Sequence, residues 1–297
     1  MGSDRRGFVE RRLNTLRRTP GFVDGHGATR KLEATWDRGA ALGLRGGVAG
    51  PSQLVFFHDP MAWFGGPVTL GWLDGPVGAP LEPLAALIDA HHDALGPDSL
   101  IECPTDDRPL IEMMIARGFG IDSVIQVGDA RHAARVIGAG PLPPGVEPLG
   151  HEHIAGVIAL HREVFSAEPE WCWFGAAPAH LQRMAEDLAR ASEGHFVLVE
   201  DGAVVGHIGA ELRADDFWGP TGGLELVLAR RLRGRGLARS LYRVALRSLV
   251  ARGARTIKGG TSQPAVLALG RALGRSWHAF NLRRGVRFAP DHFLRWL

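Results

Sequence analysis

Lysine, cysteine and tyrosine are scarce in this chain of 297 residues, which has Lys31 and Lys258 as its only lysines and Tyr242 as its only tyrosine. The two cysteines, Cys103 and Cys172, are too few for a disulfide framework or a structural zinc site, so we expect reduced, buried thiols. No uninterrupted apolar run approaches the roughly 18 residues of a membrane span, and no secretory signal is visible. We therefore expect a cytoplasmic protein with no membrane partner.

Acidic residues are missing from Leu226 to Pro290, a stretch that holds fourteen arginines and Lys258. Residues 1–225, in contrast, carry 31 acidic against 18 basic side chains. Such asymmetry indicates an anionic partner, which can be nucleic acid, a polyphosphate cofactor or the acidic half of the same chain. Charge alone leaves these alternatives open.

A linker of glycine and proline, Gly138–Gly145, divides the chain nearly in half. The length suits about two domains, and we predict them at residues 1–140 and 141–297. Apolar periodicity in the second half predicts an α/β layout. Its expected strands are Val146–Leu149, Phe196–Val199, Val204–Ile208, Gly223–Leu228 and Arg255–Gly259, with a final strand or two in the tail. The turn Glu200–Gly202 predicts a hairpin between the second and third of these strands. The expected helices are His153–Phe165, Pro178–Ala191, Leu237–Arg252 and Ala265–Leu273.

The first half repeats part of this order. Asp107 lies eleven residues before Gly118, and Gln263 lies eleven before Gly274; each follows a short strand and opens a helix. We interpret this as a weak internal repeat. Before it, residues 5–18 are expected to form a surface helix. The other elements expected in this half are strands at Leu54–Phe57, Val68–Trp72 and Leu100–Cys103 and helices at Leu81–Leu95 and Leu110–Ala116.

A loop rich in arginine and glycine joins the expected strand at 223–228 to the helix at 237–252. Gly234 and Gly236 let the backbone turn tightly, and the N–H groups at a helix start favour a phosphate. Arg233, Arg235 and Arg239 add charged donors. The local pattern therefore predicts a phosphate-binding loop. It is neither a P-loop nor a dinucleotide fingerprint, because the Gly-Lys-Ser/Thr triplet and the third glycine are both missing.

At these residues the sequence resembles the GNAT superfamily of acyl-CoA-dependent N-acyltransferases. The family signature, Arg/Gln-x-x-Gly-x-Gly/Ala, is met in full by Arg233–Ala238. Leu226 and Leu228 match the preceding strand end, and Gln263–Val266 with Gly274 match the segment downstream. The resemblance implies an α/β (α+β) fold with two GNAT-like domains, each a mixed central sheet flanked by helices.

The resemblance also implies acetyl-CoA as co-substrate. Leu228 would polarise the acetyl carbonyl through its backbone N–H, as an oxyanion donor. The other implied contacts are the strand end at Leu226, Val227 and Leu228 for the pantetheine arm, the loop residues Arg233, Gly234, Arg235, Gly236, Leu237, Ala238 and Arg239 for the phosphates, and Gln263 at the start of the next helix.

Glu225 stands where many family members carry a glutamate that serves as general base, because an amine must lose a proton before it attacks. The alternative is a structural glutamate paired with Arg230 or Arg231. His207, on a neighbouring expected strand, is a lesser candidate for the base.

The family's general acid, a tyrosine, falls on Gly270, and Tyr242 is expected to be structural. Thr261 and Ser262 are possible substitutes. A thiolate is a fair leaving group, since an unperturbed thiol has a pKa of about 8.5, so an acid is helpful rather than obligatory.

The segment Glu168–Phe174 either covers the acceptor or packs on the first half. No metal site is expected, because the histidine pairs 91–92 and 151/153 lack further ligands in a suitable spacing. In the first half, residues 73–83 stand in the place of the phosphate loop but contain three prolines and no arginine. We interpret this half as a degenerate copy.

The function expected from this resemblance is acetyl transfer to the primary amine of a small molecule, such as an amino acid, an amine metabolite or an antibiotic-like compound, by direct attack in a ternary complex. A non-catalytic acyl-CoA sensor or scaffold is the alternative. A nucleic-acid-associated basic protein ranks last, because no aromatic stacking motif accompanies the arginines. Either a monomer or a homodimer is compatible with the sequence.

Overall fold

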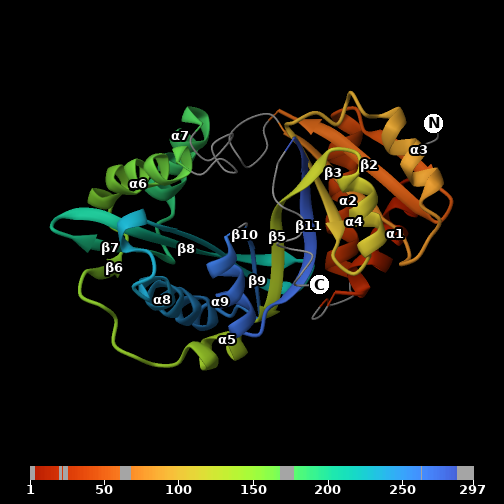
Figure 1. Cartoon of the computed structure of the whole chain (residues 1–297). Coiled ribbons are helices and arrows are strands. Elements are labelled where there is room, and N and C mark those ends of the chain that lie inside the picture. Colours follow the sequence, from red (N-terminus) through yellow and green to blue (C-terminus); the bar gives the residue numbers. More distant parts are fainter. Residues whose placement is uncertain are drawn as a thin grey trace.

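One sheet of eleven strands runs through the molecule in the order β1-β2-β3-β4-β11-β5-β10-β9-β8-β7-β6 (Figure 1). The structure is a computed structural model and describes residues 4–19, 22, 26–60, 68–167, 177–261 and 263–285. The strands are β1 Arg45–Ala49, β2 Ser52–Asp59, β3 Val68–Asp74, β4 Ser99–Pro104, β5 Phe119–Asp129, β6 Val146–Pro148, β7 His195–Glu200, β8 Ala203–Asp216, β9 Gly219–Leu228, β10 Thr256–Thr261 and β11 Ser276–Arg284. The α-helices are α1 Arg5–Arg17, α2 His26–Ala41, α3 Glu82–Ala90, α4 Arg108–Ile115, α5 Ala130–Ile137, α6 Ile154–Ser166, α7 Pro178–Arg190, α8 Leu237–Ala251 and α9 Pro264–Ala272.

The two halves of the chain exchange strands at the centre of this sheet. β5, from the first half, lies between β10 and β11 of the second half and is antiparallel to both. β11, from the second half, lies in turn between β4 and β5 of the first half. The centre of the sheet is therefore built by both halves, and neither half has a complete sheet of its own.

The order of elements repeats along the chain. In the first half β3 is parallel to β4 and is joined to it by α3, and α4 then leads into β5. In the second half β9 is parallel to β10 and is joined to it by α8, and α9 then leads into β11. Gly118 and Gly274 both end the helix before the exchanged strand with a positive φ, +84° and +74°. This repeated order supports the internal repeat expected from the sequence.

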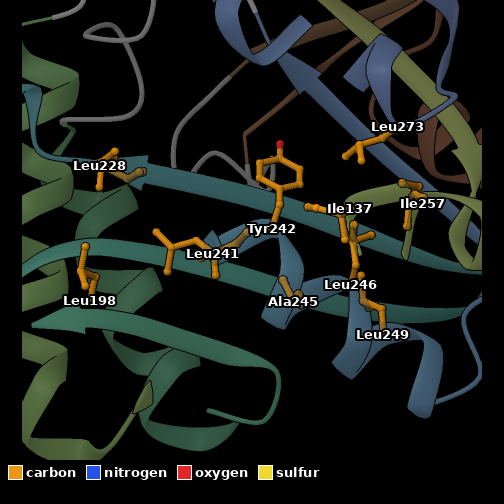
Figure 2. Close-up of a cluster of buried hydrophobic side chains, with 14 of the residues drawn as sticks. Ile137, Leu198, Leu228, Leu241, Tyr242, Ala245, Leu246, Leu249, Ile257 and Leu273 are labelled. Atoms are coloured by element: carbon orange, nitrogen blue, oxygen red, sulfur yellow. The ribbon is translucent and has the colours of Figure 1, made fainter. Parts of the chain in front are cut away.

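Helices cover both faces of the second half of the sheet. α6 and α7 lie on one face, whereas α8 lies on the other (Figure 1). α8 turns Leu241, Ala245 and Leu249 into the main apolar cluster, and α5 packs beside it through Ala133 and Ile137 (Figure 2). This packing holds fixed the start of α8, where the phosphate loop was predicted.

The helix expected near the N-terminus exists as α1, but one of its arginines points inward. Phe8 and Leu16 are buried together with Arg12, which is 3% exposed. The guanidinium of Arg12 donates to the carboxylate of Asp74 at 2.8 Å and also to that of Glu102. The periodicity of α1 indicated a helix, yet nothing in it distinguished Arg12 from the arginines that face solvent.

Most expected elements lie within a few residues of the observed ones, but α2, α5, β1 and β5 were not anticipated. Asp201, with φ of +51°, and Gly202 form the turn of the predicted hairpin between β7 and β8. In the part of the chain that the structure describes, no helix is both long and apolar enough to cross a membrane.

Candidate active site

β9 and β10 separate part-way along their length. They pair in parallel over three residues only, ending where Gly223 lies beside Lys258. Beyond that point β9 continues with β8 as far as Leu228, and β10 continues with β5 as far as Thr261. The sheet is therefore open between the second part of β9 and the end of β10.

Backbone groups of Leu226 and Leu228 face this opening. On the β10 side, the carbonyl of Pro220 accepts a hydrogen bond from the backbone N–H of Arg255. On the β8 side, the N–H of Ala229 donates one to the carbonyl of Val205. Backbone polar groups alternate along a strand, so even-numbered residues of β9 present their N–H and C=O toward β10. These are two of the three strand residues that the sequence assigned to the pantetheine arm; the third, Val227, points its backbone at β8.

The loop after β9 exposes a set of backbone N–H groups. Gly234 and Gly236 have φ of +78° and +76°, and a Cβ added to either would meet open space. Gly236 is the residue before α8. Among the residues that the structure describes, no acceptor takes the backbone N–H groups of Gly234, Arg235 and Gly236. Both glycines are thus required for their conformation, and the loop leaves donors and space for an anion.

The arginines of this loop are exposed at the start of α8. Arg233, Arg235 and Arg239 are all open to solvent, and Leu237 and Ala238 form the first helical turn between them. Arg231 instead pairs with Glu200, and Arg230 donates to the carbonyl of Ala167 at 2.8 Å. The predicted phosphate contacts are therefore brought together in one turn. Gln263, at the start of α9, follows the end of β10 on the other side of the opening.

Glu225 projects from β9 beside the opening, opposite Gly209 of β8. It makes no hydrogen bond or ion pair with any described residue, so the expected structural alternative, a pair with Arg230 or Arg231, is not found. Although Glu225 is exposed to solvent, the protein packed around it raises its pKa to about 7, and the nearby Glu211 adds to this effect. A carboxylate with this pKa can accept a proton near neutral pH.

The side chain of His207 is buried at the centre of a hydrogen-bonded chain of three histidines. Its Nδ1 lies 2.9 Å from Nε2 of His161 on α6, and its Nε2 lies 3.1 Å from Nδ1 of His195 on β7. Because His207 is 2% exposed and uses both ring nitrogens, it has no atom left for a substrate. Burial lowers the pKa of all three rings, that of His161 to about 3.

The outer end of this chain lies near Glu225. The ring of His195 covers Gly209, where an added Cβ would stand 2.9 Å from its Cε1, and Gly209 is the residue opposite Glu225. His161 Nδ1 has no partner among the described residues. Since a buried N–H without an acceptor is rarer than an unused acceptor, we infer that each ring donates outward, from His161 to His207 to His195. No pattern in the sequence pointed to His161 or His195.

The surroundings of the family's tyrosine position leave no room for a tyrosine side chain. Gly270 is buried, and a Cβ added there would overlap the side-chain amide of Gln126 from the exchanged strand β5. Tyr242 is 3% exposed in the apolar cluster, with its hydroxyl pointing away from Ala245 and Leu246 (Figure 2).

Arg275, which the sequence did not single out, lies at the base of the opening. Its guanidinium donates to the carbonyls of Gln126 at 3.1 Å and Gly259 at 3.2 Å. Thr261 is half-buried at the end of β10, whereas Ser262 and the segment Glu168–Phe174 lie outside the described residues. No three histidine, cysteine or acidic side chains gather as a metal site in the described ranges.

Comparison with known proteins agrees with this geometry. Residues 156–272 match the model of the acetyltransferase (GNAT) family. No curated protein matches the chain. A GCN5-related N-acetyltransferase from Sphaerobacter thermophilus has a similar structure, with a TM-score of 0.60 at 13% identity over 96% of this chain and 98% of that one. An acetyltransferase of the GNAT family from Colwellia psychrerythraea reaches 0.50 at 14% identity, over 89% and 98%.

The second half of the chain therefore contains a GNAT acetyltransferase domain, and the resemblance inferred from the sequence is confirmed. The fold expected from it, a mixed sheet flanked by helices, is confirmed as well. The likeness to the S. thermophilus protein extends over nearly the whole of both chains, so the first half shares in this fold. Family and fold together support an acyltransferase.

Proposed function

We propose that this protein transfers an acetyl group from acetyl-CoA to the primary amine of a small molecule. One observation carries the proposal: the opening between β9 and β10, lined by the backbone of Leu226 and Leu228, leads directly into the loop of Gly234 and Gly236. The order of backbone groups, first along the opening and then in the loop, suits a long ligand that has an amide-rich arm followed by a pyrophosphate. The strand end would bind the pantetheine amides, and the loop and α8 would bind the phosphates.

In this proposal Glu225 is the general base. The acceptor arrives as an ammonium and gives one proton to the Glu225 carboxylate; its nitrogen then forms a bond to the acetyl carbon while the carbon–sulfur bond breaks. The backbone N–H of Leu228 faces the opening and would stabilise the carbonyl oxygen as it gains charge. The thiolate leaves and takes up, through water, the second proton that the nitrogen loses as the amide forms, since position 270 offers no tyrosine.

The division at residues 140 and 141 belongs to this proposal too, with residues 1–140 as a copy without a working site. The segment between β3 and α3 has the place of the phosphate loop, but its prolines lack N–H groups and it carries no arginine. The first half then serves to complete the sheet, through β5, beside the working site.

The test is calorimetric titration of acetyl-CoA into the wild type and the double variant Arg233→Glu/Gly236→Glu, followed by thiol release with a panel of amines. Binding to the wild type alone, with thiol release for some amine, supports the proposal. Binding without thiol release for any amine would favour the non-catalytic acyl-CoA sensor. Absence of binding to the wild type contradicts both.

A further inference from the structure

A small cavity lies where the two halves meet, beneath α1 and α2. Its volume is about 80 Å³. Strands of both halves form its floor through Glu102 of β4, Lys258 of β10 and His278 of β11, and Trp218 at the β8–β9 turn closes one side. The walls are otherwise mostly apolar, with further aromatic rings from α1, β3 and the same turn.

Most charged groups of this cavity already have partners. Arg12 bonds Asp74 and Glu102, as described above. Lys31 pairs with the buried carboxylate of Asp216 at 2.9 Å. His278 places Nδ1 2.6 Å from the hydroxyl of Thr19. One cation that lines the cavity has no acceptor among these contacts.

That cation is Lys258. Its ammonium makes no hydrogen bond or ion pair with any described residue and lies over the ring of Trp218, whose centroid is 4.8 Å away. Burial lowers its pKa, while Glu102 and Asp216 act in the opposite direction without touching it. Lys258 is half-buried, and its three N–H donors favour an oxygen acceptor, because a charge withdrawn in part from water is costly without a partner.

We propose that this cavity binds a small carboxylate, held by the ammonium of Lys258 against the ring of Trp218. The volume suits roughly six water-sized groups, or an organic acid of that size, given that one water needs about 10–15 Å³ measured this way. A carboxylate supplies the missing acceptor and the missing negative charge, and its apolar remainder packs on the aromatic walls. A nucleotide or a CoA molecule is far too large for the space.

The carboxylate can be a free acid or one end of the acceptor itself. Lys258 lies beside Gly223, two residues before Glu225 on the same face of β9. Strand spacings put the Cα atoms of Lys258 and Glu225 roughly 8 Å apart. An amine that also carries a carboxylate could therefore reach both residues. This second source rests on the proposed function; binding of a free acid does not.

Ligand-observed NMR with propionate and its neutral isostere propionamide tests the site without any turnover. We expect the wild type to bind propionate and not propionamide, and Lys258→Met to weaken propionate binding at least tenfold. Arg38→Met is the control, because Arg38 lies on α2 outside the cavity lining and pairs with Asp59; its propionate affinity should stay within about threefold. Lys258→Gln is a second variant, which keeps donors and removes the charge.

A kinetic measurement separates the two sources. If the acceptor provides the carboxylate, an amino acid should have a lower KM than its amide in the wild type, and Lys258→Met should abolish this difference. Propionate binding without that preference indicates a free acid. Absence of propionate binding in the wild type, or equal binding in Lys258→Met, overturns the proposal, whereas a failure of the proposed function appears separately as loss of acetyl-CoA binding.

Discussion

Gln126 of β5 occupies the space beside Gly270 of α9, so that a Cβ added at position 270 would overlap its side-chain amide. The two residues come from different halves of the chain and meet because β5 is inserted between β10 and β11. Gln126 also donates to the carbonyl of Leu267 at 3.2 Å, which fixes its side chain under α9. The space that a tyrosine would need at position 270 is thus filled by a side chain from the other half of the chain.

Gly270→Tyr should therefore lower stability rather than restore a general acid. Overpacking of a buried site costs about 1–3 kcal/mol, so we expect a loss of that order in the free energy of unfolding, measured with urea, and no gain in kcat. Ala268→Tyr, at an exposed position of the same helix, is the control and should unfold like the wild type. A stable Gly270→Tyr variant with a higher kcat would show that Gln126 moves aside.

Glu225 should make the reaction depend on pH through its raised pKa. With a pKa of about 7, the carboxylate form grows as pH rises through neutrality, so kcat/KM should rise with pH and level off above about 7. Glu225→Gln should lower kcat by about 10²–10⁴-fold, the usual contribution of a general base, and should leave acetyl-CoA affinity unchanged. An unaltered pH profile in Glu225→Gln would assign the base to another group.

The same pKa has a consequence for stability, with a definite sign. Glu225 is harder to ionise in the folded protein than at its ordinary pKa of 4.5, so its ionisation favours the unfolded chain. Its contribution to stability is therefore lost as pH rises from about 4.5 toward 7. In urea unfolding, Glu225→Gln should lose less stability than the wild type over this window, and a parallel loss in both proteins would contradict the raised pKa.

Gly236→Ala should separate phosphate binding from backbone strain. Gly236 and Gly202 share nearly the same φ, +76° and +75°, and an added Cβ meets nothing at either. Alanine at either position should cost about 1–2 kcal/mol of stability, because an L-residue disfavours this conformation. Only Gly236→Ala should lower the affinity for acetyl-CoA, by at least tenfold as measured by calorimetry. Equal affinities in the two variants would remove the loop from the binding site.

The sequence predicted the parts of the site that follow local rules. The turn at Gly202, the strand–loop–helix from β9 to α8 and the start of α9 at Pro264 each depend on residues close together in the chain, and each was expected within a few residues. The placement of Leu226, Leu228, Gly234 and Gly236 along one opening followed from the same local order once the family resemblance was recognised.

Long-range pairing could not be predicted in this way. Nothing in β5 says that it lies between β10 and β11, since any apolar strand satisfies local preferences equally well. The exchange decides the surroundings of Gly270. The same holds for Arg12, which resembles its exposed neighbours in α1 until β3 and β4 bring two carboxylates to it, and for Lys258, whose isolation depends on α1, α2 and the β8–β9 turn.

The chain of histidines should make the protein sensitive to acid. Burial lowers the pKa of His161 from 6.5 to about 3. Between these two pH values, the unfolded chain therefore binds a proton at His161 and the folded chain does not. Stability is therefore complete above about 6.5 and falls as pH decreases through this window. From pH 6.5 to 5.0 a single such group accounts for about 2 kcal/mol, at 1.36 kcal/mol per pH unit. Urea unfolding at pH 7.5 and 5.0 measures it.

His161→Gln keeps a donor for His207 but cannot titrate, so it should lose about 2 kcal/mol less than the wild type between the two pH values. His151→Gln, at an exposed histidine before α6, should follow the wild type. If His161→Gln and the wild type lose the same free energy of unfolding between pH 7.5 and 5.0, burial does not lower the pKa of His161.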